Sequence, residues 1–222
     1  MAKKRSFRTD RPQLGSQAYS ALKKLLVSGA LPAGRFLSER QLAAQLGMSK
    51  TPVHSALERL RAEGFLDISP QQGIVVRQLT IDEILDLYEL REAIEPFVVK
   101  KLAGRLSPEQ VRMLKETLDG QEETVGAADV EGAARLDSEF HLSLCKFLGN
   151  RKIEQVMAQL CERVCRKIAR VFADDRSRMA ASVREHRQIA GALTNGQGDR
   201  AAALVIEHLD RGRRSTLAPR RR

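Results

Sequence analysis

"LSERQLAAQLGMSKTPVHSALERLRAEGF", residues 37–65, contains two short helical patterns separated by a glycine. Ser38, followed by Gln41 three residues later, predicts a capping box at the start of the first helix, and Gly47 ends that helix. Pro52 fits the first turn of the second helix, where its missing N–H group does no harm. Two short helices joined by a tight turn are typical of helix-turn-helix proteins.

The sequence on either side of this stretch extends the pattern. Upstream, apolar residues recur at helical spacing (Ala18, Leu22, Leu25 and Leu26), and "SGALPAG" ends that helix. Downstream of Gly64, the β-prone runs "FLDI" and "GIVVRQL" flank "SPQQG", which predicts a hairpin. Helices followed by a hairpin predict a winged helix-turn-helix domain over residues 13–78.

The charge of this region points to a polyanionic partner. Through Gln78 the chain has 13 Lys/Arg against 5 Asp/Glu, a net charge of +8. In a helix-turn-helix, the N-terminal residues of the second helix face base edges and phosphates in the major groove. We therefore predict binding to double-stranded DNA through that helix, the helix before it and the wing tip, with these candidate residues: Arg40, Ser49, Lys50, Thr51, His54, Gln72 and Gly73.

The motifs "LPAG", "LSERQLAAQLGMSKTPV" and "QQGIVV" resemble the DNA-binding domain of the GntR family of bacterial transcription regulators. The resemblance implies a DNA-binding role for the same seven positions. Two residues depart from the family pattern, because many members have arginine where this chain has Lys50 and His54. Neither residue holds guanine in a bidentate fork as well as arginine does, so the operator sequence does not follow from the resemblance.

From Thr80 onward the periodicity is helical throughout. "TIDE" predicts a capping box for a helix running to about Arg105, and "SPEQ" caps the next helix. Four further helices are expected over residues 129–148, 150–172, 177–194 and 199–217, with glycines at the breaks. We therefore predict a mainly α protein, with an antiparallel bundle of about six helices over residues 80–217 and basic flexible tails at 1–12 and 218–222.

Three histidines and one aspartate fall on the apolar stripes of three bundle helices. Asp137 and His141 lie four residues apart, one turn along the same helical face. His186 and His208 lie among apolar residues of two later helices. Buried ionisable groups need partners. The spacing is compatible with a divalent metal site and also with a buried hydrogen-bond network.

The bundle sequence resembles the FCD effector domain of the FadR subfamily, through "LYELREAIEP", "LDSEFHLSLCKFLGN", "EHRQIAGAL" and "GDRAAALVIEHL". The resemblance implies metal binding by Asp137, His141, His186 and His208. Zinc or nickel suits these ligands best, and manganese, iron and cobalt also fit. A small carboxylate would complete the coordination. Arg91 could bind that carboxylate, or it could form a structural ion pair within "LREAIE".

The composition and the cysteine spacing indicate where in the cell the protein is expected. No segment approaches the ~20 apolar residues that span a membrane, and the start lacks the apolar stretch of a secretory signal. The three cysteines have no CxxC spacing, which favours reduced thiols and a cytoplasmic location.

These patterns together predict a ligand-responsive transcription regulator and not an enzyme. We expect a homodimer that reads an inverted-repeat operator and senses a small carboxylate. Two alternatives stay open at this stage. One is a metal-dependent enzyme with a basic nucleic-acid-binding tether, and the other is a non-specific architectural DNA-binding protein.

Overall fold

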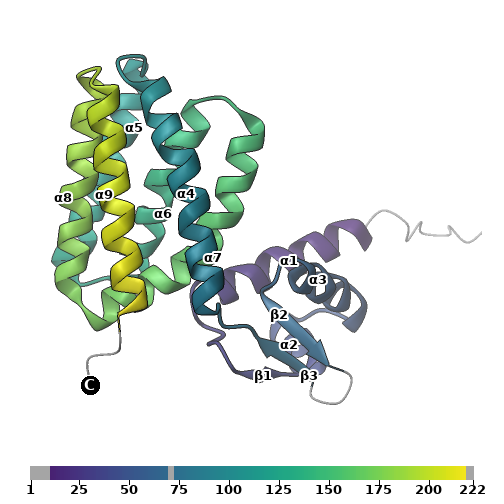
Figure 1. Ribbon diagram of the computed structural model, residues 1–222. Helices are drawn as coiled ribbons and strands as arrows, with labels where there is room; N and C mark the ends of the chain where they lie inside the picture. Colours follow the sequence, from purple (N-terminus) through teal and green to yellow (C-terminus); the bar gives the residue numbers. More distant parts are fainter. Residues whose placement is uncertain (1–10, 70–72, 219–222) are drawn as a thin grey trace, which may run out of the picture. The chain divides into compact units, whose positions relative to one another are not determined.

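The computed structural model describes residues 11–69 and 73–218 of the chain. The described residues divide after Leu79 into two compact units, an N-terminal unit of helices and strands and a C-terminal unit of helices (Figure 1). The predicted fold class is confirmed. The wing residue Gln72 and most of both predicted tails lie outside the described residues.

Three helices form most of the N-terminal unit: α1 (Arg11–Val27), α2 (Glu39–Leu46) and α3 (Lys50–Ala62). Ser38 caps α2 by accepting a hydrogen bond from the Gln41 N–H, and Gly47 ends the helix in the left-handed conformation. The reciprocal half of the predicted capping box is replaced by another contact. The Gln41 side-chain oxygen accepts from the Ser38 hydroxyl at 3.0 Å.

The wing is a three-stranded antiparallel sheet. Strands β2 (Leu66–Ser69) and β3 (Gly73–Val76) form the predicted hairpin, in which Leu66 is paired with Val76. A third strand, β1 (Phe36–Leu37), pairs with the other edge of β3, so the order is β1-β3-β2. The sequence does not indicate β1, because two residues carry too little alternation to predict a strand.

The core of the N-terminal unit joins the helices to the wing. Leu22 of α1 and Val53 and Leu60 of α3 are almost fully buried together with Ile74 and Val76 of β3. This packing fixes α3 by its apolar face. The opposite face, which carries the polar residues at the start of α3, is exposed.

The C-terminal unit contains six helices over residues 80–218 (Figure 1): α4 (Ile81–Leu102), α5 (Pro108–Ala127), α6 (Val130–Phe147), α7 (Arg151–Asp174), α8 (Arg176–Thr194) and α9 (Gly198–Leu217). Helix α4 packs along α9, and α6 packs along α7 and α5. Thr80 forms the predicted capping box with Glu83, and Ser107, the predicted cap of α5, forms a capping box with Gln110. Within the described residues, no helix has the length and apolarity to cross a membrane.

The end of α4 differs from the expectation. The helix ends at Leu102 rather than near Arg105, because Gly104 turns into the left-handed conformation with φ of 70°. Its N–H donates to the carbonyl of Leu193 in α8 at 2.9 Å. A tertiary hydrogen bond therefore sets this boundary, and local periodicity could not indicate it.

Candidate DNA interface and metal centre

The described candidate DNA-binding side chains lie on the surface of the N-terminal unit. Arg40 on α2 is exposed, as are Ser49, Lys50, Thr51 and His54 at the start of α3. Ser49 is the N-cap of α3 but makes no side-chain cap hydrogen bond. The first-turn N–H groups of α3 are therefore not satisfied by the cap and remain suited to an anionic partner such as a phosphate.

Two of these positions have structural roles as well. His54 Nδ1 lies 3.2 Å from a carboxylate oxygen of Glu39 on α2, so the imidazole bridges the two helices of the motif. Gly73 begins β3 with φ of 81°, and a Cβ there would lie 3.1 Å from the Leu37 carbonyl oxygen. The left-handed conformation and this close approach both favour glycine at position 73.

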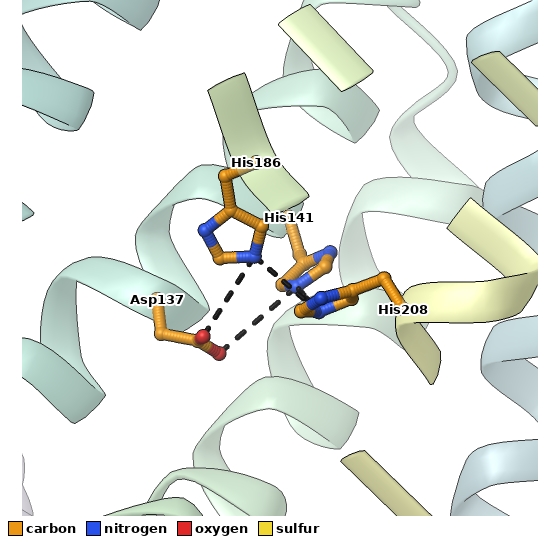
Figure 2. A group of neighbouring side chains, drawn as sticks. All are labelled: Asp137, His141, His186 and His208. Carbon is orange, nitrogen blue, oxygen red and sulfur yellow. Dashed lines mark hydrogen bonds and ion pairs between the residues drawn. The ribbon is translucent and has the colours of Figure 1, made fainter. Parts of the chain in front are cut away.

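The four candidate metal ligands converge inside the bundle. Asp137 and His141 come from α6, His186 from α8 and His208 from α9, and all four are buried. Their ligand atoms lie within 4.8 Å of one another, and Figure 2 shows the side chains pointing toward a common centre. The Nε2 atom of His208 lies 3.1 Å from Nε2 of His141 and 3.3 Å from Nε2 of His186.

The other ring nitrogen of each histidine faces a hydrogen-bond acceptor. His141 Nδ1 lies 2.6 Å from Glu95, and His208 Nδ1 lies 2.7 Å from Glu185. His186 Nδ1 lies 2.9 Å from the side-chain oxygen of Gln121. The amide nitrogen of Gln121 donates to the Leu136 carbonyl at 2.9 Å, which fixes the orientation of the amide.

The negative charges of Glu95 and Glu185 determine the tautomers of His141 and His208. Burial alone would raise the pKa of Glu95, but Arg91 and His141 outweigh it and hold the pKa at about 2. Burial also opposes ionisation of Glu185, and hydrogen bonds from His208 and Arg178 hold its pKa at about 2. Both carboxylates are therefore ionised near pH 7 and can only accept hydrogen bonds, so the Nδ1 atoms must donate.

Protonating the second ring nitrogen of His186 and His208 is disfavoured in the fold. Burial lowers the pKa of His186 well below its usual value, and the neighbouring His208 and His141 lower it further. Burial also lowers the pKa of His208, although the hydrogen bond to Glu185 opposes that shift. The neutral rings of His186 and His208 therefore direct their Nε2 lone pairs toward the shared centre.

This donor set fits a divalent cation of intermediate softness. Three neutral imidazoles and one carboxylate match zinc and its first-row neighbours and do not match calcium or magnesium. Two nitrogens that each lie about 2.1 Å from one ion are about 3.0–3.4 Å apart at octahedral or tetrahedral angles. The observed Nε2 separations of 3.1 and 3.3 Å fall in this range. A cation would also relieve the repulsion of the converging lone pairs.

A cavity adjoins this cluster and includes Asp137 and His208 in its wall. Its empty volume, mouth included, is about 330 Å³. Helix α7 contributes an apolar side through Ile168, Val171 and Phe172. The cavity therefore has a polar end at the cluster and an apolar flank.

Arg91 also lines this cavity, and both roles considered for it have structural support. Its Nε donates to Glu95 at 2.6 Å, so the structural ion pair exists. Its Nη2 atom is buried and has no hydrogen-bond partner among the described residues. The buried guanidinium therefore retains a free donor group next to the cluster.

The acceptors behind the histidines were not foreseen. Glu95, Gln121 and Glu185 come from α4, α5 and α8, and no regular spacing connects them with the ligands they contact. Glu95 lies four residues after Arg91, which was the only available sequence signal for the pair. Phe140, which stacks on the His186 ring at a centroid distance of 4.2 Å, was also missed.

The fold and the exposed polar start of α3 define a winged helix-turn-helix regulator with a C-terminal helical domain. The family model "Bacterial regulatory proteins, gntR family" matches residues 14–76, and the FCD domain model matches residues 86–211. The chain belongs to the GntR family of bacterial transcription regulators and has the GntR–FCD arrangement expected for the FadR subfamily.

Individual relatives agree with this assignment. The Nta operon transcriptional regulator of Aminobacter aminovorans is 33% identical over 178 residues, covering 80% of this chain and 82% of that protein. The uncharacterised HTH-type regulator YdhC of Bacillus subtilis is 27% identical, covering 92% of both chains. A crystal structure of a GntR regulator from Rhodococcus sp. RHA1 shares the fold with a TM-score of 0.84 at 22% identity, covering 94% of this chain and all of that one.

The matched families and relatives are transcription regulators, so the chain is a DNA-binding regulator and not an enzyme. The family assignment excludes the alternative of a metal-dependent enzyme, which the sequence patterns had left open.

Proposed function

We propose that this regulator holds one divalent metal ion in its C-terminal bundle and senses a small carboxylate there. The observation that carries the proposal is the convergence of three Nε2 atoms and one carboxylate, each histidine having its Nδ1 engaged elsewhere. The ligands would be Asp137, His141, His186 and His208. Zinc or nickel is the first choice, and manganese, iron and cobalt are compatible.

The bound ion would supply a positive charge and open coordination positions for an anion. Within the chain, Ser182 donates to Asp137 Oδ1 at 2.7 Å, which orients the carboxylate. The Nδ1 partners orient the three rings in the same way. These contacts arrange the cluster before any ligand binds.

The proposed effector carries a carboxylate and a compact apolar body. Arg91 would bind the carboxylate through its free Nη2 atom. The apolar flank of the cavity on α7 suits the rest of such a molecule. Because the cavity includes Asp137 and His208, the carboxylate could contact the ion and Arg91 together.

The proposed DNA contacts are those predicted from the sequence: Arg40, Ser49, Lys50, Thr51, His54, Gln72 and Gly73. Their support is the exposure of the five described side chains on α2 and α3 and the positive charge of the unit. We further propose a cytoplasmic homodimer that reads an inverted repeat, since a two-fold symmetric dimer presents two copies of α3 to two half-sites.

Ligand-responsive DNA binding tests this function. An operator is first obtained by selection from random DNA, and mobility shifts are then measured with zinc-loaded protein and a series of small carboxylates. We expect at least one carboxylate to change DNA affinity, and expect no response after chelation or in His186→Ala, which should still bind DNA. An equal response by zinc-loaded and chelated wild-type protein would contradict a metal-dependent sensor.

A further inference from the structure

The guanidinium of Arg91 has one nitrogen in use and another without a partner in the described residues. Arg91 is 3% exposed, and its Nε donates to Glu95 Oε1 at 2.6 Å. Its Nη2 is buried, has no hydrogen-bond partner among the described residues, and belongs to a side chain in the cavity wall. A buried charged donor without a partner is costly, so Nη2 is suited to bind an anion in the cavity.

The bonded Nε atom connects Arg91 through Glu95 to the candidate metal cluster. Glu95 is 2% exposed and accepts from Arg91 on one oxygen and from His141 Nδ1 on the other, both at 2.6 Å. His141 Nε2 then faces the cluster, 3.1 Å from His208. Arg91, Glu95 and His141 therefore form one buried chain of hydrogen bonds between the cavity and the cluster.

The chemistry of this chain links its two ends. A carboxylate that accepts the Nδ1 proton makes the opposite nitrogen of an imidazole a stronger metal ligand. The positive charge of Arg91 weakens this effect, because it stabilises the negative charge of Glu95 and makes the carboxylate a weaker acceptor for the His141 Nδ1 proton. An anion on Nη2 would offset that positive charge and leave Glu95 a stronger acceptor for His141.

We propose that Arg91 and Glu95 are positioning residues that make metal binding by His141 tighter when an anion occupies the cavity. The inference rests on the proposed function, since it assumes that the cluster binds a metal. By linkage, the metal must strengthen anion binding by the same factor. The effector then acts on the metal centre through the protein as well as by any direct contact with the ion.

The other two histidines provide internal comparisons. His186 is held by the neutral amide of Gln121, so it lacks a charged link to the cavity. His208 is held by Glu185, which already binds both terminal nitrogens of Arg178, at 2.9 and 2.7 Å. Of the three histidines with their acceptors, only His141 and Glu95 connect to an arginine with a buried terminal nitrogen that has no partner in the described residues.

The first test measures zinc affinity of the full-length protein with and without saturating acetate, by competition with a chromophoric chelator calibrated in the same buffers. Wild type should bind zinc about fivefold or more tightly with acetate. Arg91→Lys keeps a positive charge opposite Glu95 but has a single nitrogen, so it should bind zinc and lose most of the enhancement. Arg166→Lys, on α7 and outside the cavity wall, makes the same exchange, and as the matched control it should keep the enhancement.

The second test reads the chain in wild-type protein, so it does not depend on a variant that folds. In the zinc-loaded form, acetate should move the proton resonance of His141 Nδ1–H downfield and leave that of His186 nearly unchanged. Wild type that binds no zinc would overturn the proposed function itself. If wild type binds both zinc and acetate, equal coupling in wild type and Arg91→Lys would overturn the proposed link through Arg91 and Glu95 and leave the proposed function standing. A His141 resonance that acetate does not move would have the same consequence.

Discussion

At the residue scale, the candidate metal centre depends on which ring nitrogen carries the proton. Glu95 and Glu185 remain ionised in the fold, and they direct the protons of His141 and His208 to Nδ1. Gln121 has the same effect on His186 without a charge. The Nε2 lone pairs of all three rings are therefore free for one shared partner, and side chains outside the ligand set establish this arrangement.

The lowered histidine pKa values predict a pH dependence for the chelated, metal-free protein. His186 and His208 resist protonation in the fold, whereas the unfolded chain protonates near pH 6.5. The unfolded state then binds more protons, so stability is complete above about pH 6.5 and falls as the pH decreases toward the folded pKa values. Glu95 and Glu185 have pKa values of about 2 in the fold, so their contribution to the free energy of unfolding is lost only below about pH 4.3.

Urea unfolding of the chelated protein at pH 7.5 and 5.5 measures this effect, with helicity as the signal. We expect a lower midpoint at pH 5.5, and a smaller difference in a variant with glutamine at both His186 and His208. Equal midpoints for wild type at the two pH values would show that these rings are not held neutral by the fold.

We also propose that single residues on α2 and at the start of α3 determine DNA binding. Lys50→Ala and Arg40→Ala should each weaken operator binding, and Lys50→Ala should reduce the salt slope by about one unit if it contacts a phosphate. Lys24→Ala, on the exposed face near the end of α1, removes the same charge and is the control. Mobility-shift titrations indistinguishable from wild type for both α2 and α3 variants would contradict the proposed interface.

At the scale of elements, end signals and periodicity predicted most of the architecture. The capping box at Thr80 and the cap at Ser107 formed as expected, and Gly47 ended its helix. What could not be predicted depends on tertiary contacts. The end of α4 follows from the bond between Gly104 and Leu193, and β1 exists only because β3 offers it an edge.

The same division holds for the candidate site. Helical spacing placed Asp137 and His141 on one face, and the apolar neighbours of His186 and His208 indicated burial. Glu185 precedes a predicted ligand in the sequence, yet it contacts His208 on another helix. Such second contacts depend on how helices pack against each other, and periodicity within one helix contains no information about that.

One helix end offers a test of the local conformational account. Ala128, the C-cap of α5, has φ of 54°, and it is the non-glycine residue with positive φ in the described part of the chain. Ala128→Gly should stabilise the protein by about 1 kcal/mol, because glycine adopts this conformation without strain. Ala127→Gly, one residue earlier and still helical, should destabilise it by about 0.5–1 kcal/mol. Urea unfolding that ranks the two variants in the opposite order would contradict this account.

At the scale of the whole molecule, the candidate DNA-binding residues and the candidate metal ligands belong to different compact units. The DNA-binding candidates lie before Leu79, and the cluster and its cavity lie after Thr80. Loss of a metal ligand should therefore impair the effector response and largely spare DNA binding. This separation allows the sensing function to be tested without losing the regulator itself.

The most direct test of the central claim is elemental analysis of the purified protein combined with melting curves recorded with and without chelator. We predict roughly one divalent ion per chain, and a melting temperature that falls on chelation because the ion stabilises only the folded state. His186→Ala should lower metal affinity about 10–100-fold or more, whereas His54→Ala, outside the cluster, should retain the ion. Wild type that is metal-free, cannot be loaded, and melts at the same temperature with or without zinc or nickel would show that the four residues form a hydrogen-bond network, and would contradict the proposed sensor.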